Sequence, residues 1–142
     1  MPNRNRISQK VFVWAGSLVT GIAVILGALG AHWIKENINM MDIQSFETAV
    51  RYQLIHGLAI LILGALPKSY QGLLMKFVFH AFWVGTVLFS GSIYLLSTHE
   101  LTGMNFSWLG PVTPLGGLLF ITGWVLLFIL SIKQVGSRED EF

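Results

Sequence analysis

The sequence predicts an all-α integral membrane protein, a four-helix bundle with both termini on the cytoplasmic side. The first observation is composition, because 54% of the residues are hydrophobic and only 11% are charged, against about 25% charged residues in an ordinary soluble domain. The second is that the apolar residues fall in stretches of about twenty, each able to cross a hydrocarbon core of about 30 Å. The third is length, because such spans use most of the 142 residues. We therefore expect residues 1–142 to form a single membrane domain with no separate catalytic module.

The first span is predicted over residues 11–31. It follows a leader that carries Arg4, Arg6 and Lys10 and no acidic residue, and as a helix it would measure about 31 Å. The layout also resembles a signal peptide, but we expect the segment to be retained as a span.

The second and third spans are predicted over residues 43–66 and 72–97. Asp42 and Ser45 provide side-chain oxygens of the kind that cap a helix start, and Pro67 cannot continue the second helix. The connection between the two spans is too short for anything except a tight turn. The spans must therefore form an antiparallel hairpin.

The fourth span is predicted over residues 114–132. The preceding residues 98–113 mix His99 and Glu100 with glycines and Pro111, which is typical of a loop. Pro114 suits the first turn of the last helix. Residues 133–142 are expected to form a solvated, partly disordered tail.

The orientation follows from the basic residues that flank the spans. Seven of them lie on the side that contains both termini, namely Arg4, Arg6, Lys10, Lys68, Lys76, Lys133 and Arg138. Only Lys35 and Arg51 lie on the other side. The asymmetry predicts a protein of the bacterial inner (plasma) membrane with both termini in the cytoplasm. If the source is an organelle, the termini are predicted to lie in the matrix. The net charge of +2 is too small to indicate nucleic-acid binding, and the absence of cysteine excludes disulfides and thiolate chemistry.

The first span carries small residues on one face, at steps of three and four. This helix-packing seam consists of Gly16, Thr20, Ala23, Gly27 and Gly30. Small residues let helices approach closely in a membrane, where apolar side chains alone give helices no reason to associate. The seam packs either within the chain or its own oligomer, or against a partner protein.

Polar residues also follow helical faces in the second and third spans. The third span has a stripe of Lys76, His80, Trp83, Val87, Ser90 and Tyr94, which we expect to be buried, with Ala81, Gly85 and Ser92 on the opposite face. One face of the second span has Ala49, Tyr52, Gln53, His56 and Ile60, and the roughly opposite face has Glu47 and Arg51. The third helix is therefore expected to contact protein on two sides, and the polar groups of the second helix are expected to have two separate roles.

His56 and His80 form a candidate intramembrane polar pair, since both lie about 15 Å from the hairpin connection. Ionisable residues inside spans are costly and are candidates for function. Three interpretations remain open: a structural hydrogen bond to Gln53, Tyr52 or Ser90, a path for protons or a small solute, or a haem or metal site.

Glu47 and Arg51 are spaced as an ion pair within a helix, near the other membrane surface. They either pair structurally or leave Arg51 to contact a lipid phosphate. With His32 and Ser90 they would form an outer polar cluster if the helices turn the right faces together.

No enzyme motif is present: there is no nucleophile elbow, HExxH helix, phosphate loop or dinucleotide fingerprint. The four histidines have no local metal-ligand spacing. We therefore predict a protein that is not an enzyme, with no catalytic residue, no metal and no cofactor.

Four segments together resemble a known family. They are Gly27-Ala28-Leu29-Gly30-Ala31-His32, Phe46-Glu47-Thr48-Ala49 followed by Arg51-Tyr52-Gln53 and His56, Phe89-Ser90-Gly91-Ser92-Ile93-Tyr94, and Thr113-Pro114-Leu115-Gly116-Gly117 with Gly123-Trp124. From Val11 to Leu130 the chain resembles the small integral membrane proteins grouped as domain of unknown function 423, which include eukaryotic transmembrane protein 256.

The resemblance implies a compact four-helix protein of bacterial inner membranes or mitochondria, without an established activity. Candidate residues for binding lipid or a partner carry over from the motifs: His32, Glu47, Arg51, Tyr52, Gln53, His56, Ser90 and Thr113. His80 lies outside the motifs. The third connection is longer than is usual in the family, with His99 and Glu100 in the additional stretch, and Pro111 stands where a small residue is common.

Two functions compete at this point. The first is a non-catalytic accessory subunit or scaffold that binds phospholipid and a partner membrane protein or a second copy of itself. The alternative is a small carrier or proton pathway built on His56, Gln53 and His80. The first is favoured because the chain has no internal repeat and no proline inside the first three spans, unlike many secondary transporters.

Overall fold

The computed structural model describes residues 6–139, and the side chains of residues 6–134. Within that range the fold is helical, with no strand. The long helices are α1 (Gln9–Leu29), α2 (Met40–Ala65), α3 (Leu73–Ser97) and α5 (Val112–Glu139). Four helical segments of the described chain are long and apolar enough to cross a membrane. The fold class predicted from the sequence is confirmed.

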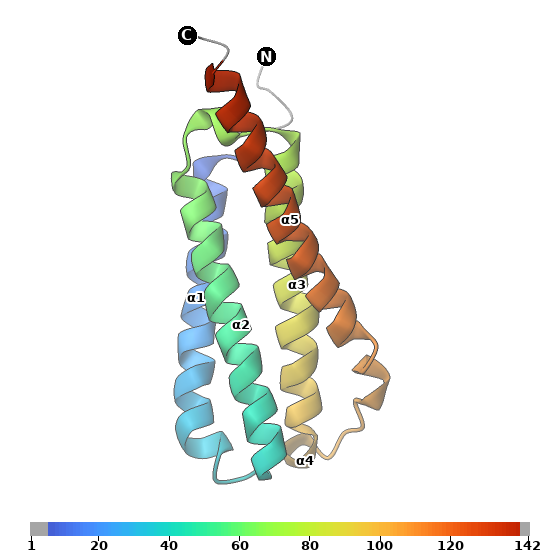
Figure 1. Ribbon diagram of the computed structural model, residues 1–142. Helices are drawn as coiled ribbons and strands as arrows, with labels where there is room; N and C mark the ends of the chain where they lie inside the picture. Colours follow the sequence, from blue (N-terminus) through green and yellow to red (C-terminus); the bar gives the residue numbers. More distant parts are fainter. Residues whose placement is uncertain (1–5, 140–142) are drawn as a thin grey trace.

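The helices run alternately up and down, so that α1 begins and α5 ends at the same end of the bundle (Figure 1). We call this the terminal end. The opposite end, the α4 end, has the π-helix η1 (Gly30–Ile34), the start of α2 and the short helix α4 (His99–Thr102). Which end faces the cytoplasm stays a prediction from the basic residues, of which Arg4 and the side chain of Arg138 lie outside the described part.

Several helix ends differ from the prediction. The first helix continues through η1, so His32 is helical. α2 begins at Met40, because Asn39 and not Asp42 caps it: the Asn39 side chain accepts a hydrogen bond of 2.9 Å from the Asp42 backbone N–H. α5 continues through Lys133 to Glu139, past the predicted end at Ile132, since no proline follows Ile132 there.

Glycines allow α1 and α2 to lie close together. A Cβ atom on Gly16 would lie 2.6 Å from Cγ of Leu61 and 2.9 Å from the carbonyl oxygen of Gly57. On the α2 side, a Cβ atom on Gly64 would lie 2.6 Å from Cβ of Phe12. The remaining seam residues follow the same interface, where Gly27 faces Val50 and Gly30 faces Phe46. The seam of the first helix is therefore occupied within the chain.

A second glycine interface joins α3 to α5. A Cβ atom on Gly116 would clash with the backbone of Phe89, and one on Gly123 would lie 2.5 Å from the ring of Phe82. From the α3 side, Gly85 meets Phe120 and the Gly116 carbonyl oxygen, at 2.9 and 3.2 Å from an added Cβ. Close backbone approach of this kind strengthens van der Waals packing between membrane helices.

The interior between the two helix pairs is filled by aromatic and aliphatic side chains. Phe12 of α1 meets Phe79 of α3 edge to face, with ring centroids 5.1 Å apart, and Phe82, Ile60 and Met75 are almost wholly buried. Large apolar side chains of α1 and α5 remain exposed on the outside, as expected for helices that face lipid hydrocarbon.

The predicted burial of the α3 stripe is only half right. Ser90 is buried and Tyr94 half-buried, but Lys76, His80 and Val87 are exposed. The hydrogen bonds of the stripe to α2 lie at Ser90 and Tyr94, towards the α4 end, where α2 and α3 converge (Figure 1). Because the helices cross at an angle, a straight stripe contacts its neighbour over part of its length.

Candidate functional site

Gln53 is the centre of a buried polar network that joins three helices. Its side-chain nitrogen donates to the carbonyl oxygen of Val19 on α1 at 2.9 Å. Its side-chain oxygen accepts from the Tyr94 hydroxyl on α3 at 2.7 Å. Gln53 itself is only 6% exposed. The Gln53 side chain therefore bonds α2 to both α1 and α3, and both the nitrogen and the oxygen of its amide group have partners.

Two further hydrogen bonds connect helices near the α4 end. The Ser90 hydroxyl donates to the carbonyl oxygen of Ala49 at 2.9 Å, which ties α3 to α2. The hydroxyls of Ser92 and Thr113 lie 2.7 Å apart, which ties α3 to α5. Ser90 and Thr113, both candidates from the sequence, thus hold helices together.

His56 is buried at the contact between α2 and α5. The Trp124 indole N–H donates to Nε2 of His56 at 3.1 Å, and Nδ1 lies 2.8 Å from the carbonyl oxygen of Tyr52. Because an indole can only donate and a carbonyl can only accept, the hydrogen of the ring is assigned to Nδ1. Both ring nitrogens are therefore engaged. The ring also stacks on Phe120, with centroids 3.5 Å apart.

The structure does not bring His56 and His80 together. His80 is exposed, and its Nδ1 lies 2.7 Å from the Lys76 carbonyl oxygen of its own helix. His56 instead points towards Phe120 and Trp124 of α5. The hairpin places the two residues at a similar depth but leaves the direction in which each helix face points undetermined.

Three residues of the predicted outer cluster, His32, Glu47 and Arg51, do not bond to one another in the described part of the chain. All three residues are exposed, and among the described residues no hydrogen bond or ion pair links any of them to another. Glu47 and Arg51 lie on the face of α2 that points away from its neighbours. Tyr52 is 40% exposed and packs its ring against Phe89, with centroids 4.7 Å apart.

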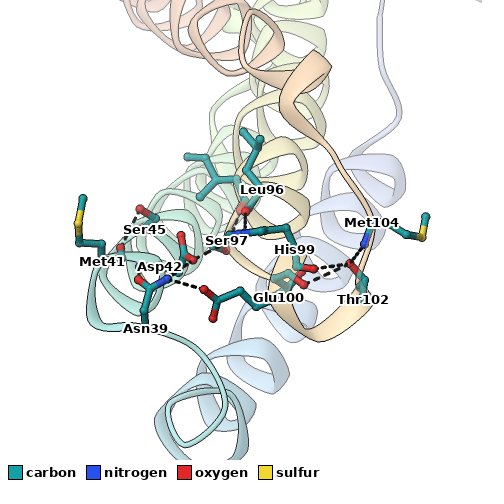
Figure 2. A network of polar contacts seen from close by, with 12 residues as sticks. Asn39, Met41, Asp42, Ser45, Leu96, Ser97, His99, Glu100, Thr102 and Met104 are labelled. Atoms are coloured by element: carbon teal, nitrogen blue, oxygen red, sulfur yellow. Dashed lines mark hydrogen bonds and ion pairs between the residues drawn. The ribbon is translucent and has the colours of Figure 1, made fainter.

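A different polar network lies at the α4 end and was missed by the sequence analysis. It joins Asn39 and Asp42 of the α2 start to His99 and Glu100 of α4 (Figure 2). The two pairs of residues are about sixty positions apart in the sequence, so local spacing gave no indication that they meet. Trp124 was missed as the partner of His56 for the same reason, although it belongs to a recognised motif.

These features define a class of protein: a small multi-pass membrane bundle whose buried polar side chains bind helices to one another. No catalytic constellation is apparent among them. The chain belongs to the family described as "Protein of unknown function (DUF423)", whose model matches residues 26–117.

Curated bacterial relatives cover nearly the whole chain. A UPF0382 membrane protein of Staphylococcus haemolyticus is 38% identical over 128 residues, which is 90% of this chain and 100% of the relative. The UPF0382 membrane protein YwdK of Bacillus subtilis is 36% identical over 130 residues, 89% of this chain and 100% of that protein. No solved structure matches. The names of the relatives, together with the four candidate spans, confirm a multi-pass membrane protein.

Replacing Trp124 with phenylalanine is expected to lower the free energy of unfolding by roughly 0.6–1.7 kcal/mol, which spans the average and the maximum found for hydrogen bonds between membrane helices. Phenylalanine keeps the aromatic contact with Phe82 but leaves Nε2 of His56 without its donor. Denaturant unfolding in detergent measures the change. Trp108→Phe is the control, because Trp108 is 70% exposed. Equal losses in the two variants would contradict the assigned role of the indole.

Proposed function

We propose that the protein is a non-catalytic accessory subunit or scaffold of the membrane, which binds phospholipid and a partner membrane protein or a second copy of itself. One observation carries the proposal: Gln53, His56 and Ser90 inside the bundle are engaged in bonds between helices, whereas Arg51 is exposed without a protein partner among the described residues. Interior groups that hold helices together are poorly suited to passing a proton or solute. Binding at the outer surface suits the exposed groups better.

Arg51 is the residue best placed to bind a lipid headgroup. It lies about 16 Å along α2 from Met40, on a face shared with Glu47, Ile55 and Leu58, all of them exposed. A long side chain at that depth can extend towards the membrane surface. A guanidinium group binds phosphate through paired hydrogen bonds, so an anionic phospholipid would satisfy it.

α1 has a second set of small residues that are exposed and could contact a helix of a partner protein. The seam around Gly16 is occupied by α2, but Ser17, Gly21 and Ala28 are exposed on another face. A Cβ atom on Gly21 would meet nothing within 4 Å. This face would allow the close approach that helices need for association in a membrane.

Replacing Arg51 with alanine should weaken the binding of anionic phospholipid by at least about tenfold and so lower the amount that copurifies, since a hydrogen bond to a charged group contributes about 1.5–3 kcal/mol. Native mass spectrometry of protein purified in mild detergent measures the bound lipid. Lys35→Ala is the matched control, because it removes one exposed positive charge at the same end of the bundle.

Unchanged lipid in Arg51→Ala, or equal loss in both variants, would contradict the lipid role. The same spectra report protein partners, and a stable complex with another membrane protein or a homo-oligomer is the expected result. A solitary monomer whose proton flux in liposomes disappears in His56→Ala would overturn the proposal in favour of the carrier.

A further inference from the structure

We propose that Asp42, His99 and Glu100 bind a divalent transition-metal ion, with Zn²⁺ as the probe, at the α4 end of the bundle. The proposed site is independent of the lipid and partner surfaces. Each of the three residues offers one ligand atom, and these atoms all lie within 4.8 Å of one another. Histidine nitrogens and carboxylate oxygens are both ligands that zinc takes in proteins.

The ligands come from two segments that the fold brings together. Asp42 lies in the first turn of α2, and His99 and Glu100 begin α4, directly after α3. Figure 2 shows the three side chains turned towards one another across this junction. The Nδ1 atom of His99 lies 3.7 Å from Oδ2 of Asp42.

Asn39 holds the two carboxylates beside each other. Its side-chain nitrogen donates to Oδ2 of Asp42 at 2.7 Å and to Oε1 of Glu100 at 3.1 Å. Two carboxylates held this close repel each other, and the neutral amide of Asn39 does not compensate their charge. A divalent cation bound between the two carboxylates would compensate their charge.

The imidazole of His99 also has the environment that a metal ligand needs. Its Nδ1 lies 2.9 Å from the carbonyl oxygen of Leu96 and 3.7 Å from Oδ2 of Asp42, so Nδ1 carries the hydrogen and the lone pair is on Nε2. The exposed ring would turn so that Nε2 meets the ion. Histidines that bind metals usually donate their other ring N–H in this way.

An ion can reach the site and complete its coordination there. The side chains of His99 and Asp42 are 48% and 20% exposed. A cavity of about 600 Å³ lined by His99, Glu100, Met104 and Phe106 adjoins the site and leaves room for water ligands. Zinc bonds of about 2.0–2.2 Å place neighbouring ligand atoms about 3.3–3.6 Å apart, so these partly exposed side chains need to close by about an ångström.

Isothermal titration of the untagged, metal-free full chain in detergent with ZnCl₂ tests the proposal. We expect one Zn²⁺ ion per chain, and affinity at least tenfold weaker in His99→Gln and in Glu100→Gln. His80→Gln and Glu36→Gln are the matched controls, because they remove an exposed histidine and an exposed carboxylate outside the site. Both controls should bind as the unaltered chain does.

Thermal unfolding supplies a second measurement, since an ion that binds only the folded state raises the midpoint. Zn²⁺ should raise the midpoint of the unaltered chain and of both controls, but not that of His99→Gln. Without metal, His99→Gln and Glu100→Gln should unfold as the unaltered chain does. If one of them fails to fold, the other still decides the result. Absence of Zn²⁺ binding, or affinities equal in site and control variants, would overturn the proposal and leave a surface polar network.

Discussion

Gly116→Ala is expected to destabilise the bundle by about 3 kcal/mol, at the upper end of the range for an overpacked core. The added Cβ atom would meet the backbone nitrogen of Phe89 and lie 2.8 Å from its Cα atom. A side chain could rotate away, but a helix backbone cannot, so α3 and α5 must move apart. The separation would also strain the Ser92 contact with Thr113. Denaturant unfolding in detergent measures the loss.

Gly21→Ala is the control for this experiment. Gly21 lies in a helix, as Gly116 does, but an added Cβ there meets nothing within 4 Å. Alanine has the better helix propensity, so this variant should be unchanged or slightly more stable. If Gly116→Ala is as stable as Gly21→Ala, then α3 and α5 do not pack as closely as described.

Gln53→Leu is expected to cost about 2 kcal/mol, because it removes two hydrogen bonds between helices at roughly 0.6–1.7 kcal/mol each. Leucine is close to glutamine in volume, so packing is largely preserved. The Val19 carbonyl oxygen and the Tyr94 hydroxyl lose their partner at the same time. The variant should unfold at lower denaturant concentration than the unaltered chain.

Tyr94→Phe separates the two bonds, since it removes only the one to the Gln53 oxygen. It should cost less than Gln53→Leu, and the double variant should lose less than the sum of the two single losses. Gln44→Leu, at an exposed position of α2, controls for the change in residue type. Strict additivity of Gln53→Leu and Tyr94→Phe would show that the two side chains do not interact.

The fold class and the number of spans were predictable from hydropathy and length alone. Crossing a bilayer requires about twenty apolar residues in a helix that satisfies its own backbone groups, and that requirement is local. The small residues from Gly16 to Gly30 were likewise recognisable as one face, because helical periodicity is a property of the chain itself. Helix ends shifted at Ile34, at Asn39 and beyond Ile132, and the predicted loop over 98–113 contains the short helix α4.

The candidate site was only partly predictable. Gln53, His56 and Ser90 stood out as polar residues within spans, but their partners did not. Trp124 lies 68 positions from His56, and Tyr94 lies 41 positions from Gln53. Periodicity tells which residues share a face, but it does not tell which neighbour that face meets.

Tertiary structure alone decided which polar residues are buried and which are paired. His56 and His80 look alike in sequence, yet one lies against α5 and the other is exposed, because crossing helices contact each other over part of their length. Asp42, His99 and Glu100 looked unrelated, yet the junction of α2 with α4 brings them together. Contacts of this kind depend on the rotation and crossing angle of packed helices, which arise from all the side chains at an interface together.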